Sequence, residues 1–409
     1  MTNLPQGWKW KSLGEICFIT DGTHKTPNYI ETGIPFLSVK NISKGFFDLS
    51  DVKYISLEEH NKLIKRAKPE FGDILICRIG TLGKAIKISL EFEFSIFVSL
   101  GLLKPKVKII SDYLVYFLNS CFIEEWINDN KVGGGTHTAK LNLNILEKCP
   151  IALPPLKEQE RIVGILDENF AKIDENIKIL EQDLLNLDEL MQSALQKAFN
   201  PLKDNAKENY KLPQGWEWKS LGEIANTSSG GTPSRNKKEY WENGNIKWLK
   251  SGELNDGYID FIEENITEEA IKNSSAKIFQ KGTLLIAMYG ATAGKLGILN
   301  LDSTTNQAIC AFLHKDKNIK FLEKFLFYFL FFLRDKIIKD SFGGAQPNIN
   351  QTYIKNLQIP LPPIKEQEQI ASHLDELSSH VKNLKQNYQA QIKDLQELKN
   401  SLLDKAFKG

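Results

Sequence analysis

Two long stretches of the chain carry the apolar spacing of a coiled-coil helix. After a pair of prolines, residues 157–199 contain no further proline, and their apolar residues recur at alternating steps of three and four. A comparable stripe runs through residues 374–402. Such a heptad seam needs a partner helix to bury it. At about 1.5 Å per residue, a helix of about 43 residues is about 64 Å long.

The remaining sequence alternates between short β-rich apolar runs and isolated helical stretches. Glycine-rich turns at 133–135 and 343–344 interrupt these runs. We therefore expect an α+β fold, in which two mixed globular domains are separated by two long antiparallel coiled-coil helices. The predicted strands cover residues 34–39, 74–79, 96–103, 246–250, 283–289 and 308–314, and the predicted short helices cover residues 112–128 and 320–339.

The sequence contains one large internal duplication. Between its matching segments the two copies diverge, so we infer two copies of one scaffold that carry different surfaces. In the first matching pair a single position differs, where Lys9 is replaced by Glu217. Three segments recur at the same offset of 208 residues: 4–16 at 212–224, 153–160 at 361–368, and 187–199 at 395–407.

The duplication and the heptads divide the chain into five parts. A linker of about a dozen residues extends at most about 42 Å, at about 3.5 Å per residue, which is shorter than either long helix. The second helix must therefore run back along the first, and a pseudo-twofold axis relates the two halves. The parts are domain one (1–153), a first long helix (154–200), a linker (201–211), domain two (212–361) and a second long helix (362–409).

Charge and cysteine usage restrict the class of protein. The formal net charge of +1 is weak for a nucleic-acid binder. Basic residues nevertheless exceed acidic ones by 19 to 16 in residues 1–150 and by 21 to 18 in residues 201–360. Five scattered cysteines without a CxxC pair predict a reducing compartment and no structural zinc. Because residues 1–10 lack the apolar core of a signal peptide and residues 325–333 are too few to span a bilayer, we expect a cytoplasmic protein without a membrane partner.

Two unlike domains on a rigid spacer fit two kinds of function. Such domains can meet duplex DNA at two half-sites on one face, and their difference would give an asymmetric, interrupted target. The same geometry fits a coiled-coil scaffold with two protein-binding heads. The apolar pattern alone does not distinguish these alternatives.

Short motifs favour the first alternative. Leu-Pro-x-Gly-Trp-x-Trp opens each half, Leu-Pro-Pro-[Leu/Ile]-Lys-Glu-Gln-Glu-x-Ile enters each long helix, and Lys-Ala-Phe closes each helix. Together with segments 248–254, 289–295, 305–308 and 346–349, these motifs resemble the specificity subunit of a type I restriction–modification enzyme over essentially the whole chain.

That resemblance implies two target recognition domains, each reading one part of a bipartite site in double-stranded DNA. It also implies a non-catalytic chain with no cofactor of its own. S-adenosylmethionine would bind to two modification (methyltransferase) subunits. ATP and Mg would serve the restriction (translocase and nuclease) subunits.

The sequence lacks the patterns that would make this chain one of those enzymes. An amino-methyltransferase needs an Asn/Asp-Pro-Pro-aromatic loop, whereas residues 153–156 and 361–364 have neither the polar residue nor the aromatic one. The segment Gly290–Lys295 has only three residues between its glycines, and Leu296 stands where a phosphate loop carries Ser or Thr. We therefore expect neither methyl transfer nor ATP binding.

Polar and basic residues in predicted turns are the candidates for contacting DNA, because bases are read by directional donors and acceptors and phosphates by cations. The alternative for each of them alone is a solvated loop residue or a turn side chain whose hydrogen bonds are satisfied within the chain. Arg78 stands where domain two has Met288, and a buried salt bridge is the competing interpretation for it. We expect His24 and His137 to be turn residues and not metal ligands. The candidates in domain one are Thr23, His24, Lys25, Lys40, Asn41, Arg78, Thr81, Lys84, Thr136, His137, Thr138 and Lys140. Those in domain two are Ser229, Thr232, Ser234, Arg235, Asn236, Lys237, Lys238, Lys250, Tyr289, Thr292, Lys295, Asn306, Gln307, Gln346 and Asn348.

The duplicated helix entrances predict a partner that binds twice. Their acidic residues also suit the positive end of a helix dipole, so a purely structural role is the alternative. The resemblance favours docking of the modification subunits. The residues concerned are Lys157, Glu158, Gln159 and Glu160 in the first copy and Lys365, Glu366, Gln367 and Glu368 in the second.

Overall fold

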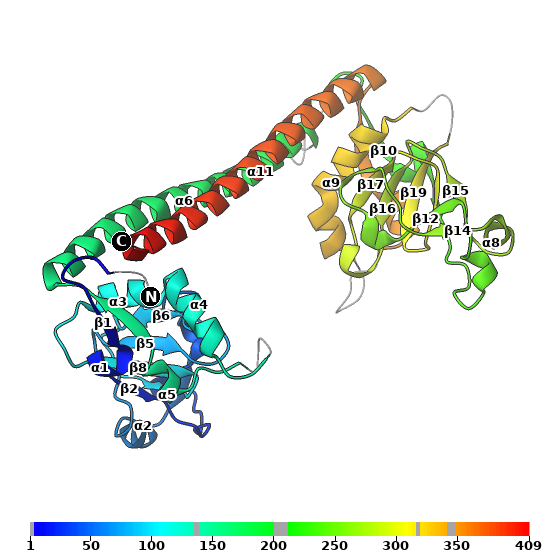
Figure 1. Cartoon of the computed structure of the whole chain (residues 1–409). Coiled ribbons are helices and arrows are strands. Elements are labelled where there is room, and N and C mark those ends of the chain that lie inside the picture. The colour runs from blue at the N-terminus through cyan, green and yellow to red at the C-terminus, as the bar shows by residue number, and fades with distance from the viewer. Residues whose placement is uncertain (1–3, 135–138, 200–211, 316–319, 342–348, 409) are drawn as a thin grey trace. The chain divides into compact units, whose positions relative to one another are not determined.

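A computed structural model describes residues 4–134, 139–199, 212–315, 320–341 and 349–408. The chain divides into two compact units: unit 1 comprises Met1–Glu181 and Gln389–Gly409, and unit 2 comprises Gln182–Tyr388. Each unit contains one globular domain and parts of both long helices (Figure 1). The predicted linker lies outside the described residues, and the five-part division stays a sequence prediction.

The centre of unit 1 is a four-stranded sheet in the order β2-β8-β5-β6, accompanied by a three-stranded sheet (β4-β3-β7) and a two-stranded ribbon (β1-β9). The strands are β1 (Lys9–Ser12), β2 (Cys17–Asp21), β3 (Ile34–Leu37), β4 (Lys53–Ile55), β5 (Ile74–Cys77), β6 (Ala85–Lys87), β7 (Ser95–Ile96), β8 (Leu100–Pro105) and β9 (Pro150–Leu153). The short helices are α1 (Leu13–Ile16), η1 (Val39–Asn41), α2 (Leu57–Leu63), α3 (Ser111–Leu118), α4 (Cys121–Asn130) and α5 (Leu143–Leu146).

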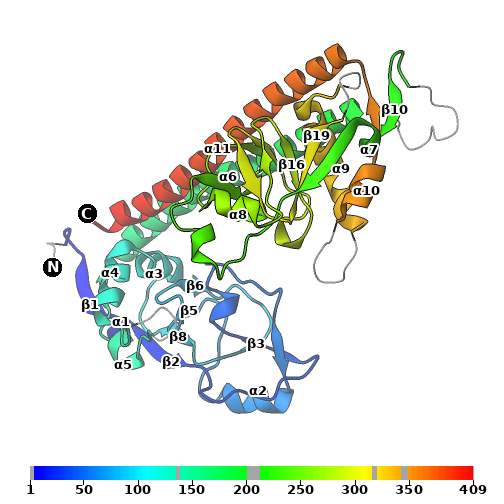
Figure 2. The same ribbon diagram turned by 90° about the vertical axis from the view of Figure 1, so that its right-hand side faces the viewer.

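Strand β5 is apolar throughout because both faces of its sheet are buried. Ile74 and Ile76 belong to a cluster that contains α3 and α4 residues, whereas Leu75 and Cys77 join a second cluster with β3 and β8. In two perpendicular views, α3 and α4 lie on one side of the sheet and α2 lies on the other (Figures 1 and 2).

Unit 2 repeats this plan with a five-stranded sheet (β11-β19-β16-β17-β13), a four-stranded sheet (β14-β12-β18-β15) and a ribbon (β10-β20). The strands are β10 (Glu217–Ser220), β11 (Ala225–Ser229), β12 (Ile246–Leu249), β13 (Gly257–Ile259), β14 (Asn265–Ile266), β15 (Ile278–Phe279), β16 (Leu284–Ala287), β17 (Leu296–Leu299), β18 (Ser303–Thr305), β19 (Ile309–His314) and β20 (Gln358–Leu361). The short helices are α7 (Leu221–Ile224), η2 (Lys238–Tyr240), η3 (Ser251–Glu253), α8 (Glu268–Lys272), η4 (Gly290–Thr292), α9 (Glu323–Lys339) and α10 (Gln351–Asn356).

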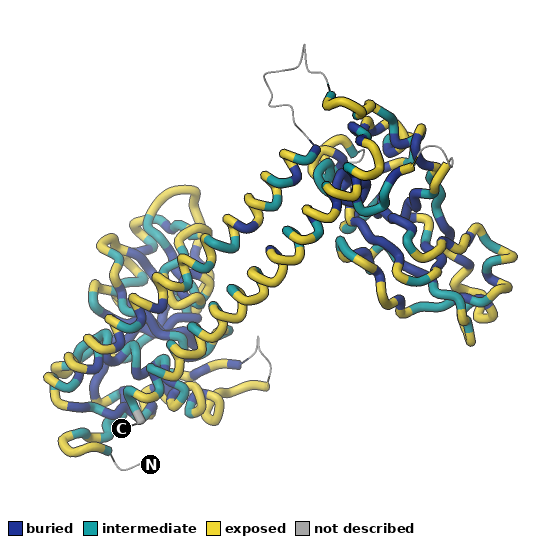
Figure 3. Tube along the Cα trace, turned by 90° about the horizontal axis from the view of Figure 1, so that it is seen from above, coloured by how far each residue is buried: buried dark blue, intermediate teal, exposed yellow. Residues whose placement is uncertain are grey.

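The two long helices are α6 (Leu156–Phe199) and α11 (Ile364–Lys408). In unit 1 the beginning of α6 packs against the end of α11, where Lys399 Nζ lies 2.7 Å from Asp174. In unit 2 the end of α6 packs near the beginning of α11, and Lys385 pairs with Asp188. Buried and half-buried positions recur along both helices, and exposed positions occupy the rest (Figure 3). The α+β class and the antiparallel helix pairing are therefore confirmed.

The single helix predicted over residues 112–128 is wrong, because α3 ends at Leu118 and α4 begins at Cys121. Between them, the Asn119 amide donates to the backbone oxygen of Ala85 (2.8 Å) and accepts from its N–H (3.1 Å). This side chain binds the edge of β6 and stops the helix, an effect that periodicity does not reveal. Within the described ranges, no helix is long and apolar enough to cross a membrane.

Candidate nucleic-acid interface

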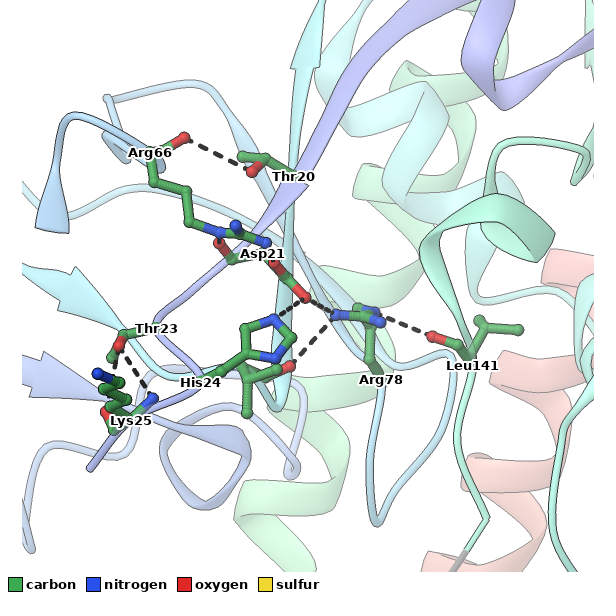
Figure 4. Close-up of polar contacts among 9 residues, drawn as sticks. Thr20, Asp21, Thr23, His24, Lys25, Arg66, Arg78 and Leu141 are labelled. Carbon is green, nitrogen blue, oxygen red and sulfur yellow. Dashed lines mark hydrogen bonds and ion pairs between the residues drawn. The ribbon is translucent and has the colours of Figure 1, made fainter.

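A buried carboxylate organises the candidate surface of domain one (Figure 4). Asp21, the last residue of β2, is 1% exposed and accepts hydrogen bonds from the guanidinium groups of Arg66 and Arg78. The His24 imidazole lies 3.1 Å from the same carboxylate. Burial opposes ionisation of Asp21, but the two arginines outweigh it and hold its pKa below the usual 3.8. The segments that contain His24, Arg66 and Arg78 are thereby held together by one carboxylate.

The two arginines differ in what they offer to a ligand. Arg78 is 8% exposed, and its Nε also donates to the backbone oxygen of Leu141 (2.9 Å). Arg66 keeps 54% of its side chain exposed although it pairs with the same Asp21. Arg78 thus has the buried salt bridge that was the competing interpretation, and Arg66 is the guanidinium that reaches the surface.

The other described candidates of domain one lie on several separate segments. Thr23 and Lys25 form a tight turn, in which the Lys25 N–H donates to Thr23 Oγ1 (3.2 Å). Lys84 passes beside Gly45 just after η1. Of the η1 pair, Lys40 is exposed, whereas Asn41 is buried and bonded to the backbone of Asp48.

Thr81 and Lys140 are exposed. Lys140 forms an isolated antiparallel β-bridge with Ile79, the residue after Arg78. Their positions bring the 78–84 loop and the 139–141 segment together. Thr136, His137 and Thr138 lie outside the described residues.

In domain two, an arginine held between tryptophans orders the candidate loop after β11. The Arg235 guanidinium carbon lies 3.7 Å from the ring centroid of Trp241 and 4.8 Å from that of Trp248. Its Nη1 is 2.6 Å from Glu264, which also accepts from Lys250 Nζ (2.8 Å). Cation–π contact and ion pairing hold the Arg235 side chain in place and order the loop, while about half of that side chain stays exposed (51%).

A second network joins three further candidates of domain two. Thr232 Oγ1 donates to the side-chain oxygen of Gln307, and the Tyr289 hydroxyl donates to the backbone oxygen of Gln307 (2.7 Å). Ser229 accepts from the Gln351 amide (2.6 Å), and the Asn306 side chain accepts from the Ala308 N–H (3.2 Å). The loops after β11, β16 and β18 therefore meet.

The remaining described candidates of domain two lie at the edges of these networks. Ser234 accepts an indole hydrogen bond through its backbone oxygen (3.1 Å), and Lys237 donates to the Tyr240 hydroxyl (3.0 Å). Thr292 is half-buried. Asn236, Lys238 and Lys295 are exposed. Gln346 and Asn348 lie outside the described residues.

The two domains place unlike side chains at one matched backbone position. In domain one, the Arg78 N–H donates to Ser99, and its carbonyl accepts from Leu141. In domain two, Met288 makes the same two backbone bonds, to Ala308 and from Ile349. The scaffold is repeated, but a charged and a neutral side chain occupy the same point of it.

The glutamine side chains at the two helix entrances form hydrogen bonds within the chain. Gln159 and Gln367 are each 1% exposed. Gln159 Oε1 accepts from the Ile110 N–H (2.9 Å), and Gln367 Oε1 accepts from the Leu322 N–H (2.8 Å). These N–H groups precede α3 and α9, whose N-caps have no side-chain hydrogen bond. Each glutamine therefore caps a domain helix from the long helix.

The neighbouring entrance residues remain available to a partner. Lys157, Glu160, Lys365 and Glu368 are exposed, and Glu158 and Glu366 are half-buried. Glu158 forms a bidentate ion pair with Arg161, whose Nε and Nη2 lie 2.8 and 2.7 Å from the two carboxylate oxygens. Docking at these positions stays a prediction.

A tyrosine–aspartate contact reinforces each glutamine contact. The Tyr116 hydroxyl of α3 donates to Asp167 of α6 (2.5 Å), and the Tyr328 hydroxyl of α9 donates to Asp375 of α11 (2.7 Å). Burial and the adjacent carboxylate raise the pKa of both tyrosines. Each domain is thus fixed to the helix that leaves it by the same pair of contacts.

Replacing Gln159 or Gln367 by leucine should lower the free energy of unfolding of the corresponding unit by about 1–3 kcal/mol, because a partly buried backbone N–H loses its acceptor. Hydrogen exchange of the α3 or α9 amides measures the loss. The control is Gln182→Leu, an exposed glutamine of α6, which should change stability by less than about 0.5 kcal/mol. Equal effects in all three variants would contradict the capping role.

Sequence reasoning missed Asp21, Arg66, Glu264 and the tryptophan pair as parts of these surfaces. Arg66 and Asp21 are 45 residues apart. A local signal for their pairing therefore does not exist. Among the described residues, no group of three or more His, Cys, Asp or Glu side chains is arranged to hold a metal ion.

Comparison with known proteins identifies the repeated scaffold. The family model described as the type I restriction modification DNA specificity domain matches residues 5–183 and 213–394. The chain is 27% identical over 431 aligned residues to the StySPI type I restriction enzyme specificity subunit of Salmonella potsdam, covering 99% of this chain and 89% of that protein.

Solved structures agree on the fold. The HsdS subunit from Thermoanaerobacter tengcongensis matches with a TM-score of 0.60 and 23% identity, over 100% of this chain and 98% of the other. A chain from a structural study of complex assembly and conformational transition in the type I R-M system matches with a TM-score of 0.79 and 23% identity, over 100% and 99%. With two matched segments that together span most of its length, the chain belongs to the family of type I restriction–modification DNA specificity proteins.

Proposed function

We propose that this chain is the non-catalytic subunit that gives a type I restriction–modification enzyme its DNA sequence specificity. Family membership supports the role in DNA recognition. In the finer proposal, each domain reads one part of an asymmetric bipartite site, and the long helices dock two modification subunits.

The observation that carries this proposal is a repeated scaffold with unlike side chains at matched backbone positions. Arg78 and Met288 occupy one matched backbone position, and Asp21 of β2 is matched by Ser229 at the end of β11. Arg78, Met288 and Asp21 are buried, so they shape the loops around them. The exposed polar side chains of those unlike loops would select different bases. An asymmetric target follows from that difference.

The catalytic groups belong, in this proposal, to partner chains. Modification subunits would bind S-adenosylmethionine, and restriction subunits would bind ATP and Mg. The exposed charges at the two helix entrances, such as Lys157 and Lys365, offer equivalent positions for two copies of one modification subunit.

The experiment is a duplex-binding titration on the chain assembled with its modification subunits. The duplex carries the sequence that becomes methylated in cells expressing both. We expect the logarithm of the affinity to fall linearly with the logarithm of the salt concentration, by about 0.9 per phosphate contacted. A duplex with that sequence scrambled should bind at least about 1,000-fold more weakly.

The same titration on the chain without the modification subunits measures the DNA affinity of this chain alone. Affinity that is independent of salt, or equal for the two duplexes, in the assembled complex would contradict the proposal. No detectable binding of either duplex would favour a scaffold that binds only proteins.

A further inference from the structure

We propose that an open pocket in domain one binds a backbone phosphate of the DNA, an inference that rests on the proposed function. The pocket is lined by Thr23, His24, Lys25, Lys62, Leu63 and Arg66. The first three residues come from the turn after β2, and the others come from α2 and the segment that follows it. Cationic or protonatable side chains make up four of the six, and none is acidic.

The carboxylate bonded to Arg66 is already neutralised. Both oxygens of Asp21 are engaged, Oδ1 by Arg66 and Oδ2 by Arg78 and His24. Two guanidinium groups on one carboxylate leave an excess of one positive charge at this point, before His24 is counted. Because Arg78 is buried, the excess positive charge is accessible at Arg66, which is exposed and lines the pocket.

Asp21 also fixes the direction of the Arg66 side chain. The Arg66 Nε donates to the backbone oxygen of Asp21 (3.2 Å), while Nη2 binds its carboxylate. A guanidinium has five N–H donors, so donors remain after these bonds. An arginine held in this way has lost its rotamer freedom before a ligand arrives, which favours binding of a planar or tetrahedral oxyanion.

The remaining cations lie on the exposed rim. Lys25 is exposed, and Lys62 is 61% exposed with one exposed partner, Glu58, at 2.8 Å. An exposed pair of this kind is weak, so a phosphate can recruit Lys62 at little cost. An open, exposed pocket suits a phosphate on a large duplex, and phosphate contact fixes position without reading sequence.

Domain two does not repeat this arrangement, because Ser229 stands at the position of Asp21 and bonds to Gln351. The inferred phosphate contact therefore belongs to domain one alone. Loss of it should weaken binding without altering either part of the methylated sequence.

The test uses the assembled complex of the previous subsection with two variants, Arg66→Gln and the double variant Lys25→Gln/Lys62→Gln. The double variant leaves the Asp21 cluster intact, so it tests the pocket even where Arg66→Gln lowers stability. The matched control is Lys53→Gln, an exposed lysine of domain one that pairs with Asp51 at 3.3 Å. Thermal unfolding verifies that each variant folds.

Each variant should lose affinity by about fivefold to tenfold at 0.1 M salt for each phosphate contact removed, and the slope of the salt dependence should fall by about 0.9 per contact. The methylated sequence and the Lys53→Gln control should be unchanged. Unaltered affinity and slope in both variants, with normal salt-dependent binding by the wild type, would overturn the pocket but leave the proposed function standing. A wild type without salt dependence would remove the proposed function itself.

Two further outcomes separate the source and the role of the ligand. Inorganic phosphate alone, titrated into the wild-type complex, should bind no more tightly than about the millimolar range. Micromolar binding that the double variant abolishes would overturn the assignment to DNA and indicate a free phosphate ligand. A changed methylated sequence in either variant would mean that the pocket reads bases, and it would overturn the phosphate assignment.

Discussion

Replacement of Arg78 by methionine, the residue at the matched position of domain two, is expected to lower the free energy of unfolding of unit 1 by about 3 kcal/mol. Breaking a buried ion pair costs about 3–5 kcal/mol because one charge stays buried, and Arg66 remains to compensate Asp21 in part. Hydrogen exchange of the β2 and β8 amides measures the loss. The amides of unit 2 in the same chain serve as the internal reference.

Coupling between the two partners distinguishes this explanation from simple loss of packing. Asp21→Asn combined with Arg78→Met should cost less than the sum of the single changes by at least about 0.5 kcal/mol. Because the pKa of Asp21 is lowered in the folded chain, the stability from this pair is present above about pH 4 and lost as pH falls through the lowered value. The difference between wild type and Arg78→Met should therefore shrink in acid. Additive costs that do not change with pH would contradict the ion-pair explanation.

The second large effect concerns the aromatic residue that ends α6. Phe199 is 4% exposed, and its ring centroid lies 5.3 Å from that of Phe325 and 5.6 Å from that of Phe329. Phe199→Ala should lower the free energy of unfolding of unit 2 by about 3–5 kcal/mol, because the buried ring is lost and a cavity remains. Hydrogen exchange of the α9 amides measures it.

The matched control is Phe261→Ala in the same unit, since Phe261 is 75% exposed. It should change stability by less than about 0.5 kcal/mol. A loss as large as that of Phe199→Ala, or a negligible loss in both variants, would contradict the role of Phe199 as the link between α6 and the core of unit 2.

The features predictable from sequence are those with a local period or an internal copy. A heptad is visible within two turns, so both long helices and their need for a partner followed from spacing alone. The duplication gave the matched position of Arg78 and Met288, and their equal backbone bonds agree with it. The apolar run of residues 74–79 predicted a strand, and β5 lies within it.

Other features depend on contacts between distant segments, which composition and period do not encode. The division of the predicted helix at Asn119 requires the edge of β6, 34 residues away. The sequence indicates that Arg235 is an exposed loop cation, but it does not show that Arg235 stacks on Trp241 and Trp248 and pairs with Glu264.

The glutamines of the two entrances show the same limit in another form. Gln159 and Gln367 stand among charged residues and suggested a partner surface. Their amides instead cap α3 and α9 of the same chain. A polar residue at a duplicated position signals a duplicated contact, but the sequence does not say whether that contact is internal.

The assignment of one half-site to each domain is tested most directly by mapping methylated adenines in DNA from cells that express this chain with its modification subunit. The map is made before and after residues 5–150 are exchanged for those of another member of the family. We expect an asymmetric motif in two parts, of which the exchange alters one part and leaves the other unchanged. A single uninterrupted motif, or a change in both parts, would contradict the assignment of one half-site to each domain.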